Sequence, residues 1–334
     1  MQIMKNTEKT TENEVRSKAE VLQALEPLVE NLTEAHKQKR RLWMPNDFLP
    51  ADEQMDSDQH DRQERLREQA KAIPDSERVA LAMNLLTEEG LPHFHRLIAY
   101  HLGDSKPWQD WNFLWTAEED RHGSLLRDYA RESRLFEFGS VDQMQYNYQE
   151  AGFTPEWEND PYRLFVYTTL QERATQVSHR NTGKKVADVE PQLDGILKKI
   201  AAEEARHYSF YRGVFQGILE IDPNRALASA LKILPAIDMP GLSMPNFREM
   251  SEVIRRREIY TPWDYKAIVE EAIRFWKVDV LTGLNEVGRA AQDKIMSIPK
   301  RLERIAEYIE SRTKPRTFSF DFTYDREISL GDPV

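Results

Sequence analysis

The sequence predicts an all-α fold that closes with a short β-hairpin. Three observations support this prediction. Along most of the 334 residues, apolar side chains recur three and four positions apart, which is the spacing of amphipathic helices. Prolines such as Pro74 and Pro161 stand at the ends of these stretches, where a helix stops or starts. Only from Phe318 to Tyr324 do aromatic and polar residues alternate one by one, as in a strand.

Two helices are predicted in the N-terminal part. Apolar residues from Leu22 to Leu32 mark an amphipathic helix, which ends before the turn-like stretch 43–47. Residues 61–72 form a strongly charged helix, which Pro74 closes.

The next two helices lie on either side of a turn. Asp75 or Ser76 can cap a helix that runs through Glu88 and Glu89 towards Tyr100. A turn over residues 103–107 follows, and a long helix extends from about 108 to 134.

The second half of the chain carries four further helices. Pro161 fits the first turn of a helix that continues to about residue 182. Apolar periodicity marks the others at about 190–220, 262–284 and 289–312. No linker rich in Pro, Gly or Ser divides the chain. We therefore expect a flexible N-terminus over residues 1–13, a single helical-bundle domain over 14–316, and a β-hairpin tail over 317–334.

The composition excludes several classes of site. There is no cysteine, so disulfides, thiolate zinc sites, iron–sulfur clusters and cysteine nucleophiles are impossible. The formal net charge of −11 argues against nucleic-acid binding. No apolar stretch is long enough to span a membrane. No targeting peptide is visible, so we expect a cytoplasmic protein, or one of the plastid stroma if the chain is a mature plant-type form.

Local basic clusters interrupt the acidic sequence. They suit either solvated helix faces or a docking surface for an acidic protein. The clusters are at Lys37–Arg41, Lys184–Lys185, Lys198–Lys199 and Arg255–Arg257.

A repeated pentapeptide carries the chemical information. Residues 118–122 and 203–207 both read Glu-Glu-x-Arg-His. Residues three apart share one face of a helix, so each copy can present a carboxylate and an imidazole to a common point. Both copies lie on apolar stripes, where charged groups are costly unless they are paired or bind a metal. The repeat therefore favours a metal centre over exposed helix ion pairs.

Carboxylates from two further helices are expected to complete such a centre, as in di-iron carboxylate bundles. Glu172 is a good candidate because it interrupts the apolar stripe of its helix. On the preceding helix the periodicity allows either Glu88 or Glu89. Carboxylates and imidazoles together suit iron or manganese, and this set can hold two ferrous ions.

The motifs then match a known family in order. They are Trp43-x-Pro45-x-Asp47-Phe48-Leu49-Pro50, Thr87-Glu88-Glu89-x-Leu91-Pro92, Trp115-Thr116-Ala117-Glu118-Glu119-x-Arg121-His122-Gly123, Gln171-Glu172-Arg173-Ala174-Thr175, Ser178-His179-x-Asn181-Thr182, Glu204-x-Arg206-His207 and Trp276-Lys277-Val278-Asp279-x-Leu281-Thr282-Gly283-Leu284. From about Trp43 to Leu330 the chain resembles the soluble, plant-type acyl-acyl carrier protein (ACP) desaturases, which have a ferritin-like di-iron bundle.

The resemblance implies roles for particular residues. It implies two iron ions per subunit, with the ligands Glu88, Glu119, His122, Glu172, Glu204 and His207. It places Thr175 beside the oxygen site and Trp43 on the electron path. Glu203 stands between this tryptophan and a ligand histidine, where the family usually has the shorter aspartate. The stretch between Glu88 and Glu119 also looks shorter than in the plant enzymes, which could reshape the acyl pocket.

The implied activity is the O2-dependent introduction of a cis double bond into a saturated fatty acyl chain on acyl carrier protein. Ferredoxin would supply the electrons, and the family forms homodimers. A narrow apolar tunnel past the irons would select the bond. Ligand sets do not fix the outcome of an oxidation, so another di-iron oxidase or hydroxylase acting on an acyl or hydrophobic substrate is the alternative.

Overall fold

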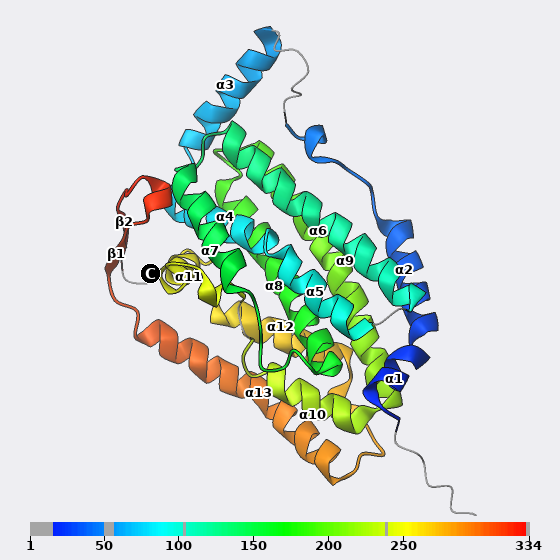
Figure 1. Ribbon diagram of the computed structural model, residues 1–334. Coiled ribbons are helices and arrows are strands. Elements are labelled where there is room, and N and C mark those ends of the chain that lie inside the picture. The colour runs from blue at the N-terminus through cyan, green and yellow to red at the C-terminus, as the bar shows by residue number, and fades with distance from the viewer. Residues whose placement is uncertain (1–15, 50–56, 103–104, 238–239, 332–334) are drawn as a thin grey trace, which may run out of the picture.

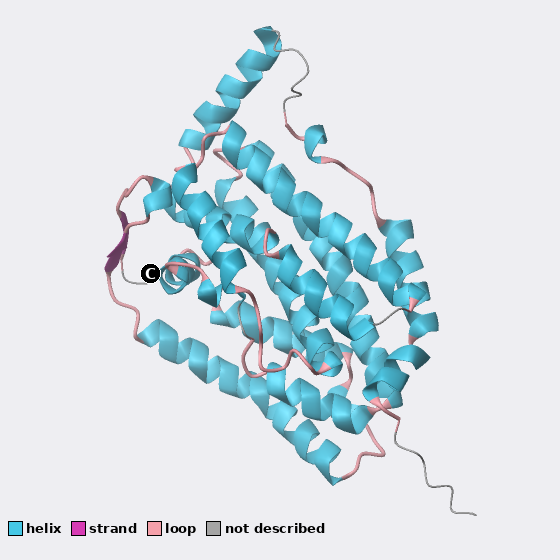
Figure 2. Ribbon diagram, viewed as in Figure 1, coloured by secondary structure: helices cyan, strands magenta, loops and turns pink. Residues whose placement is uncertain are grey.

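The computed structural model describes residues 16–49, 57–102, 105–237 and 240–331 (Figure 1). Helices make up most of this part of the chain, and two short strands lie near its C-terminal end (Figure 2). The predicted fold class, an all-α bundle with a C-terminal hairpin, is confirmed. The predicted flexible stretch 1–13 and the last residues of the tail, 332–334, lie outside the described residues.

The helices follow one another with short connections. They are α1 (Lys18–Ala24), α2 (Glu26–Lys39), α3 (Ser57–Lys71), α4 (Asp75–Glu88), α5 (Leu91–Leu102), α6 (Lys106–Glu132), α7 (Phe138–Ala151), α8 (Pro161–Val186), α9 (Pro191–Ile221), α10 (Pro223–Ile233), α11 (Phe247–Arg256), α12 (Pro262–Phe275) and α13 (Glu286–Ser311). Short 3-10 turns are η1 (Pro45–Asp47), η2 (Pro240–Ser243), η3 (Val278–Val280) and η4 (Asp321–Thr323), and the strands are β1 (Arg316–Phe318) and β2 (Ile328–Leu330).

Side-chain caps fix where the two central helices begin. The carboxylate of Asp160 accepts hydrogen bonds from the first backbone N–H groups of α8, and Glu190 does the same for α9. In both helices a proline follows the cap, where its missing N–H costs nothing. Helices α8 and α9 pack along each other, and α4 and α6 lie against them (Figure 1).

The hydrophobic core is divided into two clusters along this four-helix unit. In α6 the buried Trp108, Trp111 and Trp115 belong to one cluster, whereas Leu125 and Leu126 belong to the other. The middle of α6, α8 and α9, between the two clusters, carries buried polar side chains instead. These polar side chains form a layer that is enclosed by apolar packing on both sides. Charged groups in such a layer are stable only if they are paired or bind a metal.

One predicted helix is interrupted. The expected continuous helix from residue 75 towards Tyr100 ends at Glu88 and resumes at Leu91 as α5. Gly90 occupies the break, and a Cβ atom there would lie 2.5 Å from the hydroxyl of the buried Tyr148. Pro92 favours a new helix start because it cannot donate a backbone hydrogen bond. The prediction of one helix is wrong, and the break leaves Glu88 at the last turn of α4.

The C-terminal predictions also need correction. The helix predicted over 262–284 ends at Phe275, since the chain turns at Lys277, whose φ is 50°. The strand predicted over 318–324 includes only Phe318, which pairs with Ile328 in an antiparallel hairpin. Phe320, just before η4, and Phe322, within it, are both buried, so the chain turns to bury both rings instead of extending.

In the part of the chain that the structure describes, no helix is both long enough and apolar enough to cross a lipid bilayer.

Candidate metal centre

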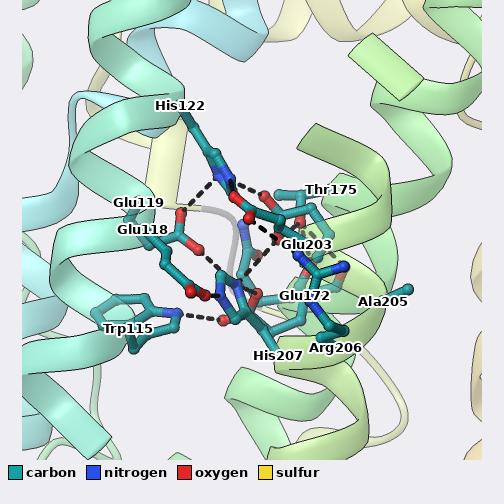
Figure 3. Close-up of polar contacts among 12 residues, drawn as sticks. Trp115, Glu118, Glu119, His122, Glu172, Thr175, Glu203, Ala205, Arg206 and His207 are labelled. Carbon is teal, nitrogen blue, oxygen red and sulfur yellow. Dashed lines mark hydrogen bonds and ion pairs between the residues drawn. The ribbon is translucent and has the colours of Figure 1, made fainter. Parts of the chain in front are cut away.

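The six side chains expected as metal ligands converge in the polar layer. They come from the end of α4 and the middle of α6, α8 and α9, and each is at most 8% exposed. Figure 3 shows the side chains of α6, α8 and α9 pointing towards one another. Their ligand atoms form two groups, each lying within 4.8 Å: Glu88, Glu119, His122 and Glu204, and Glu119, Glu172, Glu204 and His207.

The two groups share Glu119 and Glu204. Each group then adds one histidine and one carboxylate of its own. Nδ1 of His122 lies 3.1 Å from Oε1 of Glu204, and Nδ1 of His207 lies 2.8 Å from Oε1 of Glu119. The second glutamate of each pentapeptide therefore faces the histidine of the other copy. This arrangement could hold two cations, one in each group, with Glu119 and Glu204 available to both.

The first glutamates of the two pentapeptides, Glu118 and Glu203, complete this reciprocity; we call them the outer carboxylates. Nε2 of His122 donates to Glu203 at 3.0 Å, and Nε2 of His207 donates to Glu118 at 2.9 Å. An ionised carboxylate only accepts hydrogen bonds, so the neutral form of each imidazole carries its proton on Nε2. In that form, which a bound cation would favour, the lone pair of each Nδ1 faces the polar layer, as a metal ligand requires.

The unpaired atoms of the layer fit bound cations. Nδ1 of His122 and His207, and Oε1 of Glu119 and Glu204, are buried and make no hydrogen bond of acceptable geometry. These four atoms point at one another although all of them can act as electron-pair donors. Two divalent cations would satisfy them, and would balance the formal charge of the four carboxylates in the two groups.

The electrostatics of the layer show the same need for positive charge. Burial raises the pKa of Glu172, and the carboxylates of Glu119 and Glu204 raise it further. Burial lowers the pKa of His122 and His207, but the surrounding carboxylates outweigh it and raise both values well above the ordinary one. Without a cation, the raised pKa values favour protonation of Glu172, His122 and His207, which reduces the net negative charge of the layer.

Neighbouring side chains orient three of the carboxylates. Nε2 of His179 lies 2.6 Å from Oε1 of Glu88, and the indole N–H of Trp115 donates to Glu172 at 3.0 Å. The hydroxyl of Thr175 donates to Oε2 of Glu204, also at 3.0 Å.

The choice between Glu88 and Glu89, which periodicity left open, is visible in the contacts. Glu88 belongs to the first group, whereas Glu89 forms an ion pair with Arg127 on the partly exposed side of α4. The family resemblance implied Glu88 as well, and its role as a metal ligand stays a prediction.

Trp43 contacts the centre by packing against the ring of His122. The two rings stack with centroids 6.1 Å apart and an angle of 7° between their planes. Glu203 was expected between the tryptophan and the histidine. It does accept a hydrogen bond from His122, and its other hydrogen bonds come from Arg121 and Arg206. The indole N–H of Trp43 has no hydrogen-bond partner among the described residues. The contact from Trp43 to the centre is thus a direct ring stack.

A small cavity of about 40 Å³ opens beside the carboxylates. Leu91, Phe94 and Tyr167 form part of its wall, and Thr175 faces it next to Glu172 and Glu204. A cavity of this size holds one or a few molecules as small as water or dioxygen. The centre is therefore accessible to a small reactant on the α5 and α8 side.

The sequence analysis did not single out several residues of the centre. Glu118 had a signal, because it occupies the same place in the repeat as Glu203. Trp115 and His179 lay within the quoted motifs but had no pattern that showed their partners. His36 had no signal at all, since only the fold brings α2 to Glu118, where Nε2 of His36 lies 2.8 Å from Oε2.

Comparison with known proteins gives a consistent result. The sequence pattern of the fatty acid desaturase family matches residues 17–324. The chain is 36% identical over 333 residues to the chloroplastic stearoyl-ACP 9-desaturase of Gossypium hirsutum, covering 94% of this chain and 83% of the relative. It is 36% identical over 331 residues to the same enzyme of Ricinus communis, with the same coverage. Against the chloroplastic acyl-ACP desaturase of Cucumis sativus it is 34% identical over 332 residues, again covering 94% and 83%.

A solved structure shows the same fold at lower sequence similarity. The X-ray structure of DesA2 from Mycobacterium tuberculosis H37Rv, described as an acyl-ACP desaturase, matches with a TM-score of 0.57 and 20% identity. The match covers 81% of this chain and 99% of DesA2. With the family pattern over most of its length and relatives above 30% identity, the chain belongs to the fatty acid desaturase family and is an oxidoreductase.

Proposed function

We propose that the protein introduces a cis double bond into a saturated fatty acyl chain carried on acyl carrier protein. The observation that carries this proposal is the pair of buried ligand groups that share Glu119 and Glu204 beside a cavity. The names of the relatives supply the substrate class, since they act on acyl-ACP.

The proposed cofactor is a pair of iron ions in each chain. Glu88 and His122 would hold one ion, Glu172 and His207 the other, and Glu119 and Glu204 would serve both. Iron supplies the activation of dioxygen, which an unactivated methylene C–H bond requires and side chains alone do not provide. In the balanced reaction, one dioxygen takes two hydrogens from adjacent carbons together with two electrons and two protons, and leaves as two water molecules.

The side chains of the protein position the reactants. The outer carboxylates keep the proton of each histidine on Nε2, so both Nδ1 atoms stay available to metal. Thr175 lines the cavity and holds a proton on Oγ1 next to Glu204, which makes it the candidate hydroxyl beside the oxygen site. Leu91 and Phe94 give the cavity an apolar wall. A narrow apolar tunnel for the acyl chain stays a prediction.

The proposed electron donor is reduced ferredoxin, with Trp43 as the entry point through its stack on His122. Exposed basic residues at the end of α2 and just after it precede Trp43 closely in the sequence. They are Lys37, Lys39 and Arg41. They suit docking of an acidic partner, as ferredoxin and acyl carrier protein are. By contrast, Arg256 and Arg257 pair internally with Glu252 and Glu77. The homodimer stays a prediction.

Mass spectrometry of the product tests the proposal. Iron-loaded protein is incubated with ferredoxin, its reductase, NADPH, oxygen and saturated acyl-ACPs of several chain lengths. We expect a loss of two hydrogens, abolished by Glu172→Ala and retained by Glu220→Ala, since Glu220 is exposed on the same bundle. Gain of an oxygen atom would contradict desaturation and support the hydroxylase alternative. No product at any chain length would contradict the acyl-ACP substrate.

A further inference from the structure

The two halves of the centre are built on the same plan, but a different ring packs against each histidine. In the first half, Nε2 of His122 is hydrogen-bonded to Glu203, and the ring of His122 stacks on Trp43. In the second half, Nε2 of His207 is hydrogen-bonded to Glu118, and the ring of His207 stacks on His36. The ring centroids of His36 and His207 are 5.7 Å apart and their planes differ by 16°. An imidazole thus stands where the other half has an indole.

His36 makes a hydrogen bond that Trp43 does not make. Its Nε2 lies 2.8 Å from Oε2 of Glu118, the same oxygen that accepts from Nε2 of His207 at 2.9 Å. His36 is 5% exposed and Glu118 2%. Both separations are hydrogen-bond lengths to a single oxygen. The three residues therefore form a hydrogen-bonded chain from α2 to the metal-facing histidine.

The two outer carboxylates depend on different neighbours. Glu203 is held by two guanidinium groups, with Arg121 at 3.2 Å and Arg206 at 2.9 Å. Glu118 has no guanidinium so close, since Arg40 lies 3.5 Å and Arg121 3.9 Å away. Apart from His207 itself, the close donor to Glu118 among the described residues is His36.

The protonation of His36 suits a donor role. Nδ1 of His36 is buried and has no hydrogen-bond partner among the described residues. The single proton of a neutral ring is then best placed on Nε2, where the carboxylate accepts it.

We propose that His36 is a positioning residue for one of the two metal sites. It holds Glu118 in the orientation that keeps the proton of His207 on Nε2 and directs Nδ1 towards the metal. Its effect falls on the site formed with Glu172, and leaves the site formed with Glu88 and His122 intact. This inference rests on the proposed di-iron function and deepens it. It implies that the two metal sites depend on different neighbouring residues, His36 for one site and not for the other.

The test is anaerobic titration with ferrous iron, read out by Mössbauer spectroscopy of 57Fe. The variants are His36→Ala and His36→Gln, whose amide N–H can take the place of Nε2. Thr33→Val is the matched control, because Thr33 lies one turn earlier on α2 and is also 5% exposed. A double variant with Glu118→Gln shows whether His36 acts through Glu118.

The parent should bind two irons. His36→Ala should bind one of them about 10- to 100-fold more weakly, the range typical for loss of a group that orients a ligand. Only one iron's quadrupole doublet should change. His36→Gln should restore most of the affinity, Thr33→Val should keep it, and His36→Ala should add little in the Glu118→Gln background.

Three results would overturn the role of His36. They are parent-like iron affinity in His36→Ala, an equal loss in Thr33→Val, and a full additional loss in the Glu118→Gln background. A parent protein that binds no iron would instead refute the metal centre, and this role with it.

Discussion

Replacing Glu203 by glutamine removes a buried negative charge that three donors share. Glu203 is 1% exposed. It accepts from His122 at 3.0 Å, from Arg121 at 3.2 Å and from Arg206 at 2.9 Å. Glutamine has nearly the same shape, but it keeps one acceptor oxygen and turns an NH2 group towards a remaining donor. The variant therefore tests charge with little change in packing.

The expected loss can be worked out from these contacts. Removing one partner of a buried ion pair costs roughly 3–5 kcal/mol. Arg121 keeps the backbone oxygen of Trp43 at 2.6 Å, and Arg206 keeps that of Ala202 at 2.9 Å, so the low end applies. We expect Glu203→Gln to lower the unfolding free energy of the metal-free protein by about 3 kcal/mol. Iron affinity should fall about 10- to 100-fold, because His122 loses its charged acceptor.

Urea denaturation of the metal-free protein and an anaerobic iron titration measure the two effects. Glu203→Asp is the matched control, since it keeps the charge and has the acid usual in the family. It should lose no more than about 1 kcal/mol, the common size of a mild substitution. The reasoning is refuted if Glu203→Gln unfolds within about 0.5 kcal/mol of the parent, as a surface change would.

Three further variants test other parts of the structure. Gly90→Ala places a Cβ atom 2.5 Å from the Tyr148 hydroxyl, so thermal unfolding should show a loss of about 1–3 kcal/mol. Adding Tyr148→Phe should relieve part of it, and an unchanged melting temperature would contradict the close contact. Burial lowers the pKa of His101 below its ordinary value of 6.5. As the pH falls, the imidazole is therefore protonated in the unfolded chain before it is protonated in the folded one, and the unfolding free energy should fall below pH 6.5. His101→Gln should flatten this part of the curve of urea midpoint against pH, and an equal slope would count against it. Trp115→Phe leaves an oxygen of the buried Glu172 without its donor, which should cost about 1–3 kcal/mol in urea denaturation; a parent-like midpoint would show that the bond contributes nothing.

Local spacing was sufficient to predict the part of the centre that lies within single helices. The three-residue step from Glu119 to His122, and its repeat in the second pentapeptide, follows from helix geometry alone. Glu172 could be found because a charged residue interrupts an apolar stripe. Glu88 and Glu89 occupy neighbouring faces of one helix, so periodicity alone could not choose between them.

Contacts between distant segments were beyond the reach of spacing. His36 and Glu118 meet only because α2 packs against α6 and α9. The break at Gly90 depends on the position of Tyr148 in α7, a helix that the apolar pattern did not reveal. Phe318, Phe320 and Phe322 are buried as the alternation predicts, but Tyr324 is exposed and Thr323 is buried, because tertiary packing converts most of the predicted strand into a turn. Tertiary contacts overrode local preference at these positions.

The central proposal is that the polar layer of this bundle would hold two metal ions, with Glu119 and Glu204 serving both. The most direct measurement is an anomalous difference map from iron-loaded crystals, collected at the iron absorption edge. The account predicts two peaks, one beside Glu88 and His122 and the other beside Glu172 and His207, both within coordination distance of the shared carboxylates. A single peak, no peak, or peaks outside this layer would contradict it.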